Sequence, residues 1–159
     1  MQKWIIVVFS VVALIAGISF YQSQQYDFET IDGESYEWQA MQGQWVVVNY
    51  FAEWCAPCLK EVPELNAFYH QSTNSENVTL FAVSYDPLPA TKLIEIRDKY
   101  NMKFPLLNPE KTQYIPIDKP QYLPATYIID PSGNISKPLL GEQTSASLMQ
   151  AVNQLKQTF

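Results

Sequence analysis

The chain has 159 residues, 10 of them basic and 16 acidic, which gives a formal net charge of −6. This length fits one domain with at most a short appendage. Apolar residues at 47% and aromatic residues at 14% exclude a disordered chain. The acidic balance argues against a protein that binds nucleic acid, because such proteins need a basic face. The only two cysteines, Cys55 and Cys58, are too few for a disulfide-stapled scaffold.

Residues 1–22 differ from the rest in composition, since Lys3 is their only charged side chain. The uncharged run from Trp4 to Phe20 is about 25 Å long as a helix, close to the ~30 Å hydrocarbon core of a bilayer. We therefore expect residues 1–22 to be a transmembrane anchor or an uncleaved signal. By the positive-inside rule the N-terminus is expected in the cytoplasm and the domain on the extracytoplasmic, periplasmic side. A signal peptide cleaved after Ser19 is the alternative.

The remaining 137 residues carry 9 basic and 16 acidic side chains, and this length is sufficient for a self-standing core. Residues 23–27 are expected to be a polar tether and residues 28–159 a single domain. The pattern predicts these elements in chain order: a small hairpin within 28–39, a buried strand over 45–51, a helix over 57–70 kinked at Pro63, a buried strand over 77–84, a helix over 90–100, a proline-rich segment with a short strand at 106–107, strands over 126–130 and 135–140, and a helix over 145–158. This order indicates an α/β sandwich with a mixed sheet.

Cys55-Ala56-Pro57-Cys58 directly follows a predicted buried strand and opens a predicted helix. At the first turn of a helix, unpaired N–H groups and the helix dipole favour a thiolate at Cys55, and the thiolate is the form that attacks disulfides. We expect Cys55 to be an exposed nucleophile and Cys58 a shielded resolving thiol. Pro57 at an early helical position loses no hydrogen bond and stiffens the turn.

Three other interpretations of the cysteine pair are weaker. A structural zinc site needs four ligands, and the chain offers two thiols and His70. Covalent haem attachment needs a histidine directly after the second cysteine, where this chain has Leu59. A purely structural disulfide that closes so short a ring would stabilise the fold little. The pattern therefore favours redox chemistry with no bound metal and no cofactor beyond the redox-active disulfide.

The segment Phe51–Cys58 (FAEWCAPC) resembles the active-site segment of the thioredoxin superfamily. Pro63 matches the helix-kinking proline of that superfamily, and Leu123-Pro124 resembles its cis-proline loop. Further features make the chain similar to the membrane-anchored TlpA/ResA/DsbE-like branch: Asn49, Glu61, an additional helix with the stretch Phe104-Pro105-Leu106-Leu107, and LPATYIIDPSGNI over 123–135. The resemblance implies a thioredoxin-like three-layer sandwich, a mixed sheet flanked by helices.

The resemblance also assigns roles to residues near the thiols. A buried Asp in cytoplasmic thioredoxins corresponds to Asn49 here, and an amide cannot accept a proton at neutral pH. Glu61 is therefore the candidate proton acceptor, with a solvated helix carboxylate as the alternative. Asn49 and Pro63 are expected to be structural residues near the site. Glu53 is expected to be a surface charge, and the alternative is that its position tunes the Cys55 thiolate.

Trp54, Pro57, Leu123 and Pro124 are the expected substrate-binding residues. A cis Pro124 would leave the backbone of Leu123 free to pair with an extended substrate strand. Trp54 would offer apolar contact to the partner, with ordinary packing as its alternative.

Members of the resembled branch are extracytoplasmic thiol–disulfide oxidoreductases, often reductants of apocytochrome c or other exported proteins. The resemblance therefore implies an exported disulfide-containing substrate, a transmembrane thiol donor of electrons and a role in cytochrome c biogenesis. The reverse reaction, by an oxidant or isomerase, is an alternative because sequence does not fix a reduction potential. A non-catalytic module that binds an apoprotein is another. A peroxidase is disfavoured, since no Thr-x-x-Cys peroxide pocket precedes Cys55.

Overall fold

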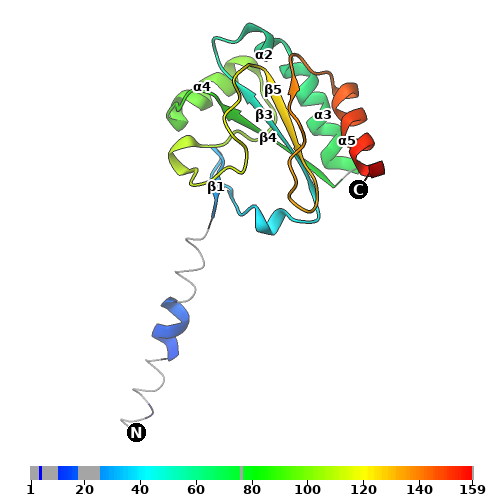
Figure 1. Ribbon diagram of the computed structural model, residues 1–159. Helices are drawn as coiled ribbons and strands as arrows, with labels where there is room; N and C mark the ends of the chain where they lie inside the picture. Colours follow the sequence, from blue (N-terminus) through cyan, green and yellow to red (C-terminus); the bar gives the residue numbers. More distant parts are fainter. Residues whose placement is uncertain (1–3, 5–10, 18–25, 76, 159) are drawn as a thin grey trace.

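Strand β3 (Trp45–Phe51) is the most buried strand of the computed structural model, which describes residue 4 and residues 11–17, 26–75 and 77–158 (Figure 1). All seven of its residues are buried. It lies inside a four-stranded sheet of order β4-β3-β5-β6, which also contains β4 (Val78–Ser84), β5 (Ala125–Ile129) and β6 (Leu139–Leu140). Strand β3 is parallel to β4 and antiparallel to β5, and β5 is antiparallel to β6. The predicted mixed sheet is therefore confirmed.

The two faces of the sheet are covered by different kinds of structure. Alternate β3 residues enter two hydrophobic clusters, as the period of two along a strand requires. One cluster is completed by three helices: α3 (Val62–Ser75), α4 (Ala90–Tyr100) and α5 (Ser145–Thr158). The opposite face is covered by smaller elements and the proline-rich loop: the hairpin of β1 (Phe28–Glu29) and β2 (Ser35–Tyr36), η1 (Gln39–Met41), and the segment after α4 that contains η2 (Pro109–Lys111).

The predicted helix over 57–70 is two helices, α2 (Ala56–Lys60) and α3, separated at Glu61. Pro63 has no N–H to donate to the carbonyl of Leu59, so the hydrogen-bond ladder cannot run through this point. Pro63 instead occupies the first turn of α3, where a missing N–H costs nothing. The expected kink is therefore a full interruption, and it places Glu61 at the junction of the two helices.

Two predicted strands are shorter than expected. The strand over 135–140 is limited to β6, with a single bridge between Ile135 and Ile129. Pro138 has no N–H for a ladder, and the Oγ of Ser136 accepts the N–H of Ile128 at 3.1 Å in place of a main-chain partner. The expected strand at 106–107 consists of isolated bridges to Ala82 and Thr30.

The expected membrane anchor over 1–22 and the tether over 23–27 lie largely outside the described residues. Among the residues that are described, no helix is long and apolar enough to span a bilayer.

Candidate redox site

The cysteine pair lies where β3 leaves the sheet and α2 begins. Cys55 is the N-cap residue of α2, and its Sγ accepts the N–H of Cys58 at 3.3 Å. The two sulfurs are joined in a disulfide. Cys55 retains 5% of its surface exposed and Cys58 only 1%. The expectation of an openly exposed Cys55 is therefore wrong in degree, because both residues are buried, although Cys55 is the more accessible of the two.

Both prolines next to the pair are exposed and lie in first helical turns. Pro57 belongs to the first turn of α2 and Pro63 to that of α3. Neither position requires an N–H donor, so both residues fix the backbone without removing a hydrogen bond.

The loop before β5 lies at the same end of the sheet as the cysteines. Ala125 pairs with Tyr50, one residue before the end of β3. The Leu123–Pro124 peptide bond is cis, as the resemblance implies. Leu123 packs against the hydrophobic cluster that contains both cysteines, and within the described parts of the chain its main chain has no hydrogen-bond partner. An extended peptide could therefore pair with this backbone, which remains a prediction.

A buried polar group lies beneath this end of the sheet. The Nδ2 of Asn49 donates to Glu61 Oε1 at 2.8 Å and to Thr126 Oγ1 at 3.0 Å. The second oxygen of Glu61, Oε2, accepts the N–H of Gln143 at 3.0 Å. Glu61 is only 2% exposed, so the alternative of a solvated helix carboxylate is wrong.

Burial raises the pKa of Glu61, and the hydrogen bonds from Gln143 and Asn49 oppose this effect without cancelling it. A carboxyl group with a raised pKa binds a proton closer to neutral pH than an exposed one does. This property suits the predicted role of Glu61 as a proton acceptor during thiol exchange.

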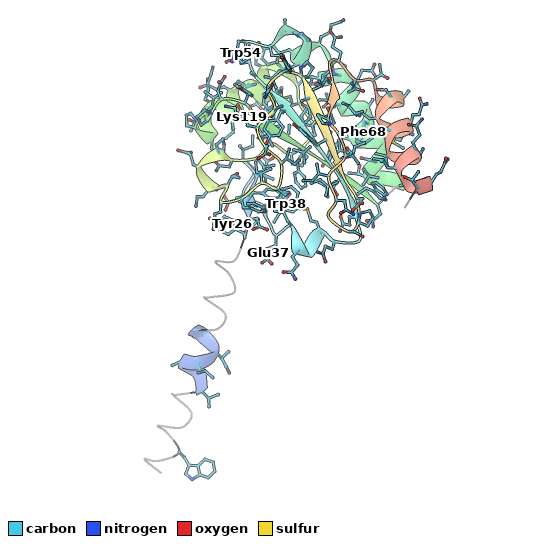
Figure 2. All side chains as sticks on the ribbon, in the orientation of Figure 1. Tyr26, Glu37, Trp38, Trp54, Phe68 and Lys119 are labelled. Atoms are coloured by element: carbon cyan, nitrogen blue, oxygen red, sulfur yellow. A yellow bond between two sulfur atoms is a disulfide. The ribbon has the colours of Figure 1, made fainter. Side chains whose placement is uncertain are left out.

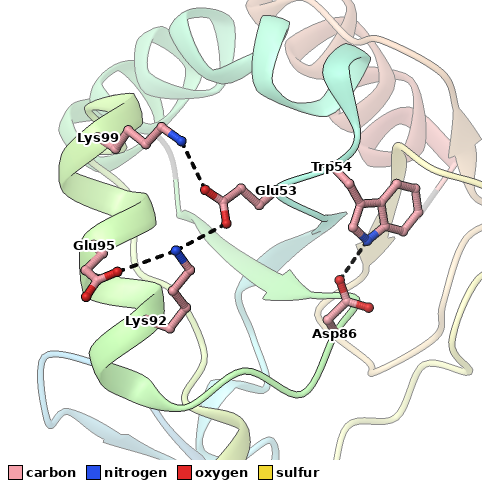
Figure 3. Close-up of polar contacts among 6 residues, drawn as sticks. All are labelled: Glu53, Trp54, Asp86, Lys92, Glu95 and Lys99. Atoms are coloured by element: carbon pink, nitrogen blue, oxygen red, sulfur yellow. Dashed lines mark hydrogen bonds and ion pairs between the residues drawn. The ribbon is translucent and has the colours of Figure 1, made fainter.

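Trp54 presents its ring to solvent directly before Cys55 and is labelled at one end of the domain in Figure 2. Its side chain is 65% exposed, so ordinary packing does not explain it. The indole Nε1 donates to Asp86 Oδ2 at 2.7 Å (Figure 3). The ring also meets the Tyr85 ring edge-on, with centroids 6.0 Å apart. Trp54 is therefore held in place while most of its surface stays available.

Glu53 is a partly exposed charge, and the structure adds two lysine partners that the sequence did not indicate. Its carboxylate pairs with Lys99 at 3.1 Å and with Lys92 at 3.4 Å, both from α4 (Figure 3). The hydrogen bond from Lys99 is the main reason that the pKa of Glu53 is lowered. These partners are distant in the sequence, and no local pattern indicates them.

Metal-ligating residues do not gather at the site. Across residues 26–75 and 77–158 and the described parts of the N-terminal segment, no group of three or more His, Cys, Asp or Glu side chains could hold a metal ion.

Comparisons with known proteins agree with this geometry. Residues 22–137 match the AhpC/TSA family. The thiol-disulfide oxidoreductase ResA of a Bacillus cereus strain is 28% identical over 118 residues, which cover 74% of this chain and 67% of that protein. The thioredoxin-like protein YneN of Bacillus subtilis (strain 168) is 26% identical over 134 residues, covering 83% of this chain and 77% of that protein.

The fold has its own counterpart among solved structures. The crystal structure of StoA from Bacillus subtilis superposes with a TM-score of 0.65 at 23% identity, covering 79% of this chain and 93% of that one. The thioredoxin-like fold is thus confirmed. The chain belongs to the AhpC/TSA family, and with its Cys55–Cys58 disulfide it is a thiol–disulfide oxidoreductase.

Proposed function

We propose that this protein is a membrane-anchored, extracytoplasmic reductase of disulfides in exported proteins, with apocytochrome c as a candidate substrate. The observation that carries the proposal is the Cys55–Cys58 disulfide at the start of α2. It lies at the sheet end where the backbone of Leu123 has no hydrogen-bond partner among the described residues. The uncharged run from Trp4 to Phe20 supports the anchor.

The position of the site within the domain fits a tethered enzyme. Tyr26, where the described domain begins, and Trp54, beside the cysteines, lie at opposite ends of it (Figure 2). A chain anchored before residue 26 would therefore present Cys55 away from the membrane surface, where exported substrates can reach it.

Reduction proceeds in two exchanges. The Cys55 thiolate attacks one sulfur of the substrate disulfide, so that a mixed disulfide forms and the first substrate thiolate leaves and takes up a proton from water. Cys58 then loses its proton, to Glu61 in our proposal, and attacks the Cys55 sulfur. The Cys55–Cys58 disulfide forms, the second substrate thiolate leaves, and Glu61 returns the proton. The substrate gains two electrons and two protons. The enzyme supplies both electrons and the proton of Cys58, and water supplies the other proton, because Cys55 enters the reaction as a thiolate.

The oxidised enzyme must then be reduced again. The same two exchanges in reverse require a dithiol protein that delivers two electrons, and outside the cytoplasm these must come across the membrane. A membrane-embedded dithiol protein is therefore the expected electron donor.

The direction of the reaction is tested by the reduction potential of the Cys55–Cys58 pair, measured by equilibration with glutathione and dithiothreitol. A potential well below that of glutathione supports the reductase. A value of about −120 mV, typical of strong oxidants, would instead identify a disulfide oxidant or isomerase.

The substrate is identified by trapping. Cys58→Ser should accumulate a mixed disulfide between Cys55 and the substrate, because the resolving thiol is missing. Cys55→Ser/Cys58→Ser is the matched control and should trap nothing. If Cys55→Ser alone keeps full function in cells, the protein is a binding module rather than a reductase.

The location is tested independently of the chemistry. The full-length chain should fractionate with membranes, and the domain should be digested by a protease added to spheroplasts. A protected domain would contradict the extracytoplasmic location.

A further inference from the structure

An ion-pair network connects α4 to the turn that carries Cys55 (Figure 3). Lys99 Nζ donates to Glu53 Oε1 at 3.1 Å, and Lys92 Nζ lies 3.4 Å from Glu53 Oε2, so both carboxylate oxygens face a lysine. Lys92 also contacts Glu95 at 3.4 Å. The Glu53 side chain is 28% exposed, while those of Lys92 and Lys99 are 41% and 60% exposed.

This network lies at the residue pair that precedes the nucleophile. Residues 52–54 link β3 to Cys55, and two of them are held by different elements. Glu53 is held by α4, and Trp54 by Asp86, which follows β4. Lys92 and Lys99 are about two helical turns apart, so they project from the same side of α4. Both therefore reach one carboxylate two residues from Cys55.

A carboxylate two residues from Cys55 adds a negative charge to the active-site turn. It would disfavour the thiolate, because like charges raise each other's proton affinity. We propose that Lys92 and Lys99 are positioning residues that offset the charge of Glu53 and thereby set the stability of the Cys55 thiolate. This inference rests on the dithiol chemistry proposed above. It gives α4, which does not carry the cysteines, control over the reactivity of the pair.

Further charged groups lie on the other elements that meet at this site: Lys60, Glu61, Asp86, Lys119 and Glu142. Lys60 and Glu142 pair with each other at 2.7 Å, and Lys119 lies over the Tyr85 ring at 3.7 Å from its centroid. Because none of them contacts Glu53, they act as a constant background when the network is altered.

The test measures the pKa of the Cys55 thiol in full-length Cys58→Ser protein, from the pH dependence of its alkylation by iodoacetamide. Lys92→Gln/Lys99→Gln should raise this pKa by about 0.3–0.5, since Glu53 is left without compensation. Glu53→Gln should lower it by about the same amount, since the lysines are left without compensation. Combining all three changes should bring it back to within about 0.2 of the unaltered protein.

The redox equilibrium supplies a second readout in the chain with both cysteines. Above the measured pKa of Cys55, Lys92→Gln/Lys99→Gln should shift the equilibrium with glutathione about two- to threefold toward the disulfide. Glu53→Gln should shift it by a similar factor toward the dithiol. A network that only supports the fold would weaken stability in both variants without moving these two quantities in opposite directions.

Matched controls separate the local effect from net charge. Lys103→Gln/Lys111→Gln removes two exposed lysines elsewhere, and Glu37→Gln removes one exposed carboxylate. Both should leave the Cys55 pKa within about 0.1, and about 0.5 M NaCl should shrink the shifts in the test variants. If the double lysine variant does not fold, Lys99→Gln alone should give a smaller shift of the same sign.

Two results would overturn the inference: no shift in either test variant, or shifts of the same sign in both. Neither bears on the proposed reductase activity, because alkylation needs only a free thiol. A protein that shows the predicted shifts but does not reduce disulfides would refute the reductase proposal alone.

Discussion

Two glutamates flank the cysteine pair, and their surroundings are opposite. Glu61, three residues after Cys58, is buried, and its hydrogen-bond donors within the described part of the chain are the amides of Asn49 and Gln143. Glu53, two residues before Cys55, lies at the surface between two lysines. Burial raises the pKa of Glu61, and the lysine hydrogen bonds lower that of Glu53.

The difference shows that the surroundings of a glutamate, and not its residue type, decide the direction in which its pKa moves. Amides stabilise a carboxylate less than ammonium groups do, so the buried group keeps its affinity for a proton. The surface group stays ionised and contributes a fixed charge. In our proposals, Glu61 on the buried side transfers a proton and Glu53 with its lysines on the exposed side sets the charge near Cys55.

Asn49→Asp should cause the largest loss of stability, because it alters the buried surroundings of Glu61. It places a second carboxyl group within hydrogen-bond distance of Glu61, and two such groups cannot both ionise without strong repulsion. The pKa of the pair rises, so stability is retained at acid pH and lost as pH increases through the raised value. We expect a loss of about 2–4 kcal/mol at pH 8 in urea unfolding of the disulfide-bonded protein.

Asn153→Asp, on the exposed side of α5, makes the same chemical change as a control and should cost less than about 0.5 kcal/mol. If Asn49→Asp lowered the free energy of unfolding equally at pH 4 and pH 8, repulsion between two buried carboxylates would not be the cause of the loss.

Glu61→Gln should remove the contribution of Glu61 to the pH dependence of the protein's stability. Because the pKa of Glu61 is raised in the folded state, its ionisation destabilises the fold as pH rises through that value. Each unit of pKa elevation is worth about 1.4 kcal/mol. Ionisation of Glu61 should therefore take stability away from the unaltered protein between pH 4 and pH 8. In urea unfolding, Glu61→Gln should become more stable relative to the unaltered protein as pH rises through this range.

The same variant tests proton transfer in the reduced protein. Glu61→Gln should slow thiol exchange by about tenfold or more and change its pH profile. Glu64→Gln, which alters an exposed glutamate of α3, should leave the rate unchanged. Identical kinetics for Glu61→Gln and the unaltered protein across pH 6–9 would remove Glu61 from the mechanism.

Local sequence patterns predicted most helices and strands of the fold, and they failed where a proline interrupts an element. Helices over 90–100 and 145–158 have the predicted bounds because one apolar face per helix is a local signal. The strand predicted over 135–140 failed because it ignored Pro138, which cannot donate to a ladder. The break at Glu61 was predicted only as a kink, since sequence does not show how far a proline disrupts a helix.

The partners of the two glutamates were beyond prediction for a different reason. Glu61 meets the N–H of Gln143, and Glu53 meets Lys99, through contacts between elements far apart in the chain. Spacing placed Glu61 near Cys58 but left open whether it was solvated. Only the packing of α2, β3 and the loop before α5 decides that it is buried.

Glu53→Gln should have the smallest effect on stability and the opposite pH dependence to Glu61→Gln. The pKa of Glu53 is lowered in the folded state, so its ion pairs stabilise the protein above its unfolded pKa and are lost as pH falls through the folded value. Glu53→Gln should lower the urea midpoint slightly at pH 7 and not at pH 3.

Because both lysines are largely exposed, high salt should also abolish the difference in urea midpoint between Glu53→Gln and the unaltered protein at pH 7. The informative quantity is the direction in which the stability difference between each variant and the unaltered protein changes with pH. Between pH 3 and pH 8, ionised Glu53 stabilises the fold while ionised Glu61 destabilises it. If both substitutions changed stability in the same direction with pH, solvent exposure and lysine pairing would not be what distinguishes the two carboxylates. The lowered pKa of Glu53 would then need a cause other than its lysines.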